Sequence, residues 1–203
     1  WAQEMLETVE TEQNVELTAA LTADLSGKSD TSELMAVVRM RDDDPGRLEL
    51  SDNPILALFD RPSNRGNLGT LIRSCDALGV EALALTGHSV DLYDPDVVVS
   101  SMGSFFKVPV IRLPSNSEVE DWIAALRQRY PALQVVGTTS HAEQALFETD
   151  LSGPVLFLIG NETEGLSARL KELSDRMATI PMAADCCASS FNVSCASTVL
   201  FYE

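Results

Sequence analysis

The sequence predicts an α/β fold, in which a doubly wound, mainly parallel sheet carries helices on both faces. The first observation behind this prediction is that short, almost wholly apolar runs recur from Asn53 onward, as in parallel strands that are covered on both sides. The second is that amphipathic stretches separate these runs, and strands that alternate with helices form sheets of this kind. The expected strands are residues 55–59, 82–86, 108–113, 133–138 and 155–160.

One intervening helix can be read from its spacing. Its apolar positions follow the i, i+3, i+4, i+7, i+11 pattern of one helix face, and a proline ends it. Because ligands of open α/β sheets bind beyond the carboxyl ends of the strands, we expect functional residues in the loops that follow strands. The positions of the helix face are Val119, Trp122, Ile123, Leu126 and Tyr130, followed by Pro131.

Residues 1–50 differ from the rest of the chain. They are acidic and helix-like at first, extended around residues 34–38, and turn-rich at residues 41–46, which we interpret as a linker. We therefore place a partial N-terminal domain and linker at residues 1–50 and an α/β domain at residues 51–203. Because the chain starts at Trp1 and stops inside an apolar, helix-like run, we expect it to be part of a longer protein.

The formal charge of −17 at pH 7 is uneven, because residues 1–60 alone contain 14 acidic and 4 basic side chains. An acidic surface repels a phosphate backbone at long range, so the charge argues against an RNA substrate. Two explanations stay open, a surface suited to high salt or basic segments outside this sequence. The sequence shows neither a membrane span nor a signal peptide, which predicts a cytoplasmic protein without a membrane partner.

The four cysteines are Cys75, Cys186, Cys187 and Cys195. They form no Cys-x-x-Cys pair, and the adjacent Cys186 and Cys187 cannot make a normal zinc corner or an unstrained disulfide. We therefore expect no metal site, and we expect buried, reduced thiols in a reducing compartment.

The first candidate functional loop, residues 64–73, follows the strand that ends at Phe59-Asp60, and together with Arg61 it gathers positive charge on an acidic chain. Its glycines permit a tight turn, and Asn67 is the expected N-cap of the helix that follows. A helix start flanked by arginines is suited to phosphate, and the alternative is an ordinary solvated helix start. The predicted RNA-binding residues are Arg61, Arg65 and Arg73.

The second loop follows the last predicted strand and reads Gly160-Asn-Glu162-Thr-Glu-Gly165. Glycines at a strand end let a ligand approach the backbone, and Glu162 offers an acceptor for the hydroxyls of a ribose. The pattern is neither the Gly-x-Gly-x-x-Gly dinucleotide fingerprint nor a P-loop. A strand–turn–helix with a capping glutamate is the alternative interpretation.

The third loop combines Ile180-Pro-Met182 with Ser190-Phe-Asn192 ahead of a C-terminal helix. Ser190 is the expected N-cap of this helix, with Asn192 in its first turn. The helix is rich in small and apolar side chains, as in helices that are buried in a core or a subunit interface. Taken alone, Ser190 and Asn192 would be read as capping residues.

In this order, the three loops resemble the motifs of the SpoU/TrmH group of RNA 2′-O-ribose methyltransferases in the SPOUT superfamily. Residues 67–73 resemble its Asn-x-x-x-x-x-Arg, residues 160–165 its Gly-x-Glu-x-x-Gly, and residues 180–182 and 190–194 its Ile-Pro-Met and Ser-Leu-Asn-Val-Ser. The resemblance extends from about residue 53 to the end. More weakly, residues 1–50 resemble the tail of a small α/β, ribosomal-protein-like substrate-binding domain that often precedes this catalytic domain.

The resemblance implies methyl transfer from S-adenosylmethionine to a ribose 2′-hydroxyl of structured RNA, either tRNA or rRNA, without a metal. It also implies a C-terminal trefoil knot, although general topology rules argue against knots, and a homodimer formed through the knot region and the C-terminal helix. The implied methyl-donor-binding residues are Thr138, Thr139, Gly160, Asn161, Glu162, Gly165, Ile180, Met182, Ser190, Phe191 and Asn192.

Arg73 could act in the reaction in either of two ways. In the family, the matching arginine is proposed to help the hydroxyl proton leave. Arginine is effectively always protonated, so Arg73 could instead anchor the neighbouring phosphate and stabilise the developing alkoxide. The implied catalytic residues are Arg73, Asn67, Glu162, Ser190 and Asn192.

Some features depart from the family pattern. Asp94 and Asp96 stand near a Ser-x-Gly stretch that basic residues often precede, the third loop is longer, and Phe191 stands where leucine is usual. These departures concern the RNA-facing surface more than the donor site. Two other functions stay open: a non-catalytic RNA-binding or assembly module on the same fold, and a nucleotide-dependent enzyme of another α/β class, which would bind a dinucleotide.

Overall fold

The computed structural model describes residues 2–28, 30–87, 90–140 and 144–203. The chain divides into two compact units, Trp1–Arg41 and Asp42–Glu203. The first contains helices α1 (Ala2–Thr8) and α2 (Ala19–Ser26), and none of its described residues is buried. The second contains the whole sheet and the core.

The second unit begins nine residues before the predicted boundary at residue 51, because the segment that we interpreted as a linker packs on the sheet. Arg47, in the short 3-10 helix η1 (Pro45–Arg47), donates through Nη2 to the Val110 carbonyl at 2.8 Å. Asp43 accepts from the Arg112 backbone at 3.0 Å, and Leu48 is buried. Residues 42–50 thus cover the edge of strand β3.

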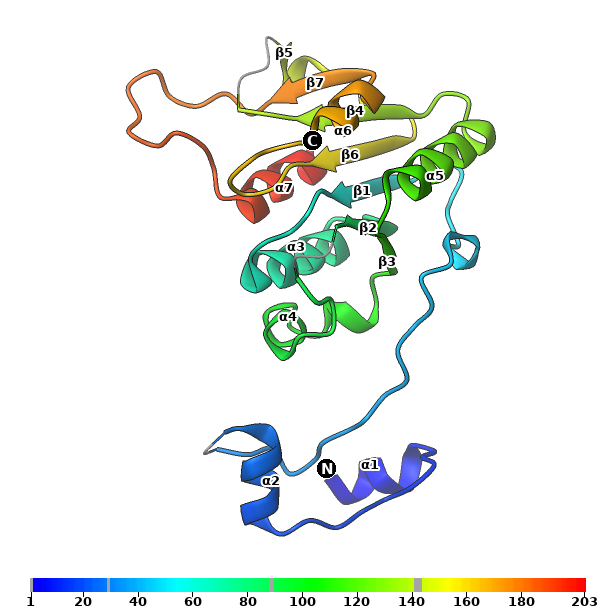
Figure 1. The fold of residues 1–203 in the computed structure, drawn as a ribbon, viewed down its shortest axis with the longest axis vertical. Helices are drawn as coiled ribbons and strands as arrows, with labels where there is room; N and C mark the ends of the chain where they lie inside the picture. Colours follow the sequence, from blue (N-terminus) through cyan, green and yellow to red (C-terminus); the bar gives the residue numbers. More distant parts are fainter. Residues whose placement is uncertain (1, 29, 88–89, 141–143) are drawn as a thin grey trace. The chain divides into compact units, whose positions relative to one another are not determined.

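The described part of the second unit contains a sheet of seven strands in the order β3-β2-β1-β6-β4-β7-β5, and every pairing is parallel (Figure 1). The predicted α/β class with a parallel sheet is confirmed. All five predicted strands form, whereas β5 and β7 were not predicted, because they are short and contain polar residues. The strands are β1 (Ile55–Phe59), β2 (Ala82–Thr86), β3 (Val110–Leu113), β4 (Gln134–Thr138), β5 (Gln144–Ala145), β6 (Val155–Ile159) and β7 (Arg176–Thr179).

Helices cover both faces of the sheet, as expected for a doubly wound domain. Helices α3 (Arg65–Ala77), α4 (Pro95–Ser100) and α7 (Val193–Tyr202) pack on one face. Helices α5 (Asn116–Arg129) and α6 (Ala168–Leu173) pack on the other. The predicted apolar face of α5 is buried, and its N-terminus carries a capping box formed by Ser115 and Glu118. Two 3-10 turns complete the unit, η2 (Ser104–Phe106) and η3 (Leu146–Glu148).

The order of the strands indicates where a ligand would bind. Strand β1 lies between β2 and β6, so the chain changes direction across the sheet at this point, where ligands of doubly wound folds bind. After β7 the chain leaves the sheet through residues 180–192 and returns as α7, which packs against α3 and β6 (Figure 1). This return is where the resemblance implies the trefoil knot, and the knot itself stays a prediction.

Gly69 lies where α3 meets α4. A Cβ atom at this position would lie 2.5 Å from the Val97 carbonyl oxygen, a backbone atom that can move only with α4. We therefore expect Gly69→Ala to lower the free energy of unfolding by about 1–3 kcal/mol, as measured by urea denaturation. Gly153→Ala is the control, because the nearest atom there is 3.9 Å away. Equal stability of the two variants would contradict the prediction.

Candidate active site

A pocket of about 360 Å³ lies beyond the carboxyl ends of β4, β6 and β7, beside the start of α7. Every predicted donor-binding residue lines it except Asn192. The pocket is therefore built from loops that are far apart in the sequence. The predicted residues in its lining are Thr138, Thr139, Gly160, Asn161, Glu162, Gly165, Ile180, Met182, Ser190 and Phe191.

Sequence reasoning missed two parts of the lining. Ala178 and Thr179 belong to β7, which was not predicted as a strand. The other part is one face of α7, and its i, i+3, i+4, i+7 spacing is the signal that could have found it. These helix residues are Val193, Ala196, Ser197 and Leu200.

The lining combines apolar and polar groups. Ile159, Ala178 and Leu200 are buried and give an apolar inner surface, while backbone groups of residues 160–165 and hydroxyl side chains form the rim. The hydroxyl of Thr138 already donates to the Leu158 carbonyl at 2.9 Å. A ligand with an aromatic or aliphatic body and several hydroxyl or amino groups suits such a surface.

Glu162 joins the first and second loops. One carboxylate oxygen accepts from the Ser63 backbone at 3.0 Å and from the Ser63 hydroxyl at 2.7 Å. The other accepts from the Asn64 backbone at 3.1 Å and from Asn67 Nδ2 at 3.3 Å. Burial acts to raise the pKa of Glu162, but the hydrogen bonds, led by that of the Ser63 hydroxyl, outweigh it and hold the pKa below its usual value.

Asn67 joins the same pair of loops to the third. Its side-chain oxygen accepts from Asn192 Nδ2 at 3.0 Å, and its carbonyl accepts from the Ser194 hydroxyl at 2.8 Å. A continuous chain of hydrogen bonds therefore runs from Glu162 through Asn67 to Asn192. Three predicted catalytic residues, from three separate loops, are in direct contact.

Both predicted N-caps are wrong by a few residues. Asn64, not Asn67, caps α3 by accepting from the Asn67 backbone at 2.9 Å. Asn192, not Ser190, caps α7 by accepting from the Ser194 backbone at 3.0 Å, and Ser190 is left as an exposed residue of the pocket rim. The physical reason is that Asn67 uses its side chain for Glu162 and Asn192, so the preceding asparagine takes the capping role.

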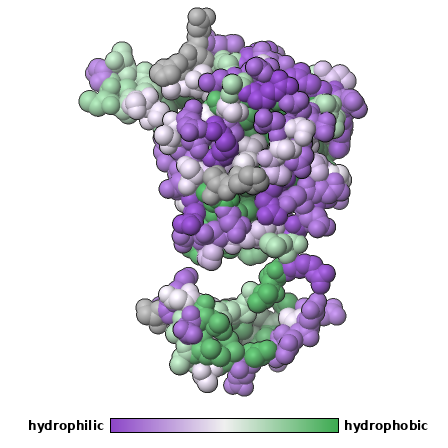
Figure 2. Space-filling model, viewed as in Figure 1, coloured by the Kyte–Doolittle hydropathy of each residue, from purple (hydrophilic) through white to green (hydrophobic). Residues whose placement is uncertain are grey.

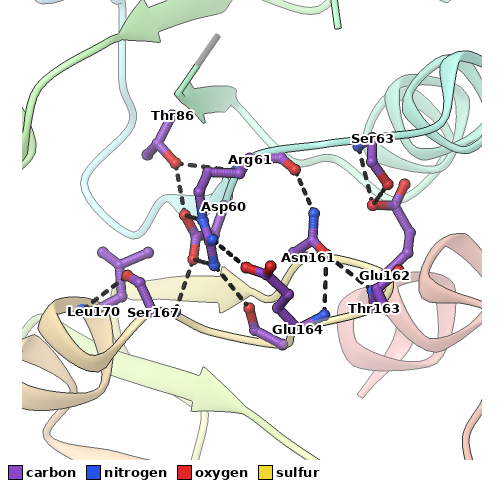
Figure 3. Close-up of polar contacts among 11 residues, drawn as sticks. Asp60, Arg61, Ser63, Thr86, Asn161, Glu162, Thr163, Glu164, Ser167 and Leu170 are labelled. Atoms are coloured by element: carbon purple, nitrogen blue, oxygen red, sulfur yellow. Dashed lines mark hydrogen bonds and ion pairs between the residues drawn. The ribbon is translucent and has the colours of Figure 1, made fainter. Parts of the chain in front are cut away.

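The three predicted RNA-binding arginines lie in different surroundings. Arg73 is exposed on α3 and forms no ion pair with the described residues. Arg65 pairs with Asp94 at 2.7 Å, and Arg61 pairs with Asp60 and Glu164 (Figure 3). None of these arginines lines the pocket of the same chain. Of the three, Arg73 is the one without a carboxylate partner among the described residues.

The family model for the SpoU rRNA methylase family matches residues 54–202, which include all three loops and the pocket. This chain belongs to the SpoU rRNA methylase family. The match confirms the resemblance that the three motifs indicate. The family's defining region thus coincides with the sheet, the pocket and the hydrogen-bond chain through Asn67.

Individual SpoU relatives agree with this assignment. The chain is 44% identical to the 23S rRNA (uridine(2479)-2′-O)-methyltransferase of Streptomyces viridochromogenes, over all of this chain and 70% of that protein. It is 31% identical to the 23S rRNA (guanosine-2′-O-)-methyltransferase RlmB of Pseudomonas aeruginosa, over 77% of this chain and 60% of that protein. It therefore spans only part of the length of these relatives.

Solved structures of methyltransferases share the fold. The crystal structure of AviRb from Streptomyces viridochromogenes in complex with the cofactor AdoMet superposes with a TM-score of 0.91 at 43% identity, over all of this chain and 76% of that one. The AdoMet-bound rRNA methyltransferase from Sinorhizobium meliloti gives a TM-score of 0.80 at 27% identity, over 91% of this chain and 68% of that one.

The cysteines of this SpoU chain correct one expectation. Cys75 is buried, and burial raises the pKa of its thiol well above the usual value. The other three were also expected to be buried, but all three are exposed, because residues 183–192 form a loop outside the core and Cys195 lies on the outer side of α7. All four are free thiols. Among the described residues, no cluster of histidine, cysteine and acidic side chains could hold a metal ion.

Proposed function

We propose that this chain transfers the methyl group of S-adenosylmethionine to a ribose 2′-hydroxyl of ribosomal RNA. The observation that carries the proposal is the hydrogen-bond chain that runs from Glu162, which lines the pocket, through Asn67 to Asn192. The related 23S rRNA 2′-O-methyltransferases and the AdoMet complex of AviRb support both the reaction and ribosomal RNA as the substrate.

The pocket fits the proposed donor in size and chemistry. Its apolar inner surface can hold an adenine ring, while the backbone groups of residues 160–165 and the rim hydroxyls can bind a ribose and an amino-acid moiety. When bound, S-adenosylmethionine supplies a methyl group on a positively charged sulfur. The protein need only hold the acceptor hydroxyl in line with that methyl group and help its proton leave.

Arg73 is the proposed contact for the acceptor RNA. It forms no ion pair with the described residues and lies on the same helix as Asn67. As an anchor it would hold the phosphate next to the target ribose and stabilise the developing negative charge on the 2′-oxygen. As a base it would need to lose a proton that arginine holds strongly, so we favour the anchor.

A homodimer through the knot region and α7 is part of the proposal. Helix α7 leaves apolar side chains exposed, with Val199 40% and Tyr202 80% accessible. A second copy packed on this surface would cover them. In such a dimer, the Arg73 that serves a given pocket could come from either subunit. Sedimentation of the chain at several concentrations would test the dimer.

The N-terminal unit is proposed to belong to a substrate-binding domain. Apolar side chains lie on the surface of this unit, among them Val15, Leu25 and Val38 (Figure 2). None of the described helices is long and apolar enough to span a membrane. A cytoplasmic location, where ribosomal RNA is accessible, is part of the proposal.

The proposed function has a direct test. Calorimetry with S-adenosylhomocysteine should show binding to the pocket. Methyl groups from labelled S-adenosylmethionine should appear on protein-free ribosomal RNA, and the phosphodiester bond after each 2′-O-methylated ribose should resist alkaline cleavage. Mass spectrometry of the nucleosides identifies the modified residue. Binding of a dinucleotide in place of S-adenosylhomocysteine, or methyl groups found on bases, would contradict the proposal.

A further inference from the structure

We infer that Arg61 is a positioning residue for the methyl-donor pocket, which holds the loop of residues 160–165 in its binding conformation, and that it is not an RNA contact. The inference rests on the proposed function, because it assigns the pocket to S-adenosylmethionine. It replaces the phosphate-binding role that the sequence predicts for Arg61.

The backbone of Arg61 connects the ends of three strands (Figure 3). Residue 61 follows β1, its N–H donates to the Thr86 hydroxyl at the end of β2 at 3.1 Å, and its carbonyl accepts from Asn161 Nδ2 beyond β6 at 2.7 Å. Asn161 lines the pocket. Residue 61 therefore ties one wall of the pocket to the two strands beside it.

The guanidinium of Arg61 holds the other end of the same loop. Nη1 donates to Glu164, and Nη2 donates to the Gly165 carbonyl at 3.4 Å (Figure 3). Asn161 and Gly165 are bonded to each other by backbone hydrogen bonds of 3.0 and 3.1 Å, so they close the loop into a turn. Both of these residues line the pocket. Arg61 thus holds the closed turn without being part of the pocket lining itself.

The buried carboxylate of Asp60 holds the guanidinium of Arg61 in place. Asp60 is 2% exposed and accepts from Arg61 Nε at 3.1 Å and from Arg61 Nη2 at 3.2 Å. It also accepts from the Thr86 hydroxyl and from the Ser167 backbone, each at 2.8 Å. A buried carboxylate with these partners fixes the direction of the guanidinium. With Asp60 on one side and Glu164 on the other, the site repels a phosphate group.

The backbone conformation of Arg61 is unusual for an arginine, and a neighbouring glycine leaves space for its side chain. Arg61 has φ of 48°, in the left-handed region that is unfavourable for residues other than glycine. Gly87 makes room for it, because a Cβ atom there would lie 2.8 Å from Arg61 Cγ. Glycine would adopt the conformation of residue 61 more easily, so the interactions of the arginine side chain offset a conformational cost.

The test compares Arg61→Gly, which removes the side chain without straining the backbone, with Arg61→Lys, which keeps the charge but not the paired donors. We expect Arg61→Gly to weaken S-adenosylhomocysteine binding and raise KM for the methyl donor about tenfold, with a much smaller change in kcat. Arg61→Lys should restore part of the affinity. The dependence of RNA affinity on salt should keep its wild-type slope, because no phosphate contact is lost.

Two further variants make the test specific. Arg169→Ala is the matched control, since Arg169 also pairs with two carboxylates, Glu120 and Glu172, but does not line the pocket or touch its loops. It should bind S-adenosylhomocysteine like the wild type. Glu164→Gln should weaken binding by itself, and it should add little to Arg61→Gly, because both changes remove the same contact.

Distinct outcomes separate the inference from the proposed function. Wild-type affinity for S-adenosylhomocysteine in a folded Arg61→Gly variant, with a salt slope lowered by about one, would make Arg61 a phosphate contact and overturn the inference alone. If the glycine variant does not fold, Glu164→Gln gives the same readout, and unchanged binding by it would overturn the inference. A wild-type chain that binds no S-adenosylhomocysteine would instead overturn the proposed function, and the inference with it.

Discussion

Arg73→Ala is expected to slow methyl transfer severely while leaving donor binding intact. Arg73 does not line the pocket, so its loss should not change the affinity for S-adenosylhomocysteine in calorimetry. The rate of methyl transfer at saturating donor should fall by about 10²–10⁴-fold, because a group that anchors the acceptor and stabilises developing charge acts mainly in the transition state. Single-turnover transfer of labelled methyl groups to ribosomal RNA measures this rate.

Arg73→Lys tests how much of the effect depends on the positive charge of this residue. Lysine keeps the positive charge but lacks the planar, paired donors of arginine, so it should retain part of the activity if Arg73 anchors a phosphate. Arg169→Ala is again the control, because Arg169 lies on α6 and already pairs with Glu120 and Glu172. Near-normal turnover by Arg73→Ala would remove Arg73 from the mechanism.

Glu162→Ala is expected to impair both donor binding and methyl transfer, in contrast to Arg73→Ala. Glu162 accepts hydrogen bonds from Ser63, Asn64 and Asn67 and also lines the pocket. Without it, the first loop is no longer held against the second, and Asn67 loses one of its two side-chain partners. We expect transfer to fall at least about a hundredfold and the free energy of unfolding to fall by about 1–3 kcal/mol.

The pH dependence of stability provides a second readout for Glu162. Because the folded protein lowers the pKa of this carboxyl, its contribution to stability is fully present above the ordinary pKa of about 4.3 and is lost as the pH falls through the lowered value. The stability difference between wild type and Glu162→Ala should therefore be constant near neutral pH and shrink in acid. Glu172→Ala, which removes an exposed glutamate of α6, is the control. A difference that does not change down to acid pH would show that the ionised carboxylate is not what holds the loops.

Local sequence predicted the elements of the fold with good accuracy. The runs at residues 55–59 and 82–86 form strands with the predicted bounds, and the apolar positions of α5 face the core. These elements could be predicted because burial on both faces of a parallel strand, and on one face of a helix, leaves a periodic pattern in the sequence. Strand β7 left no such pattern, since it has only four residues and starts with Arg176.

The helix starts show where local reading fails. Asn64 and Asn67 are both good capping residues, and so are Ser190 and Asn192. The choice between them depends on partners that are far away in the sequence. Asn67 is drawn to Glu162 and Asn192, which leaves Asn64 to cap α3. Capping preference within a few residues could not reveal this contact.

The amino-acid sequence by itself determined the class of the fold, the three loops that carry the chemistry and the family to which they belong, because hydrophobic periodicity and motif spacing are local properties of the chain. Only the tertiary structure decided what each polar side chain does. It placed Asn67 between Glu162 and Asn192, and it directed Arg61 to Glu164 while leaving Arg73 exposed. The physical reason is that charges and hydrogen-bond donors act over a few ångströms in space, and the partners of these residues are brought within that range only when the strands pair.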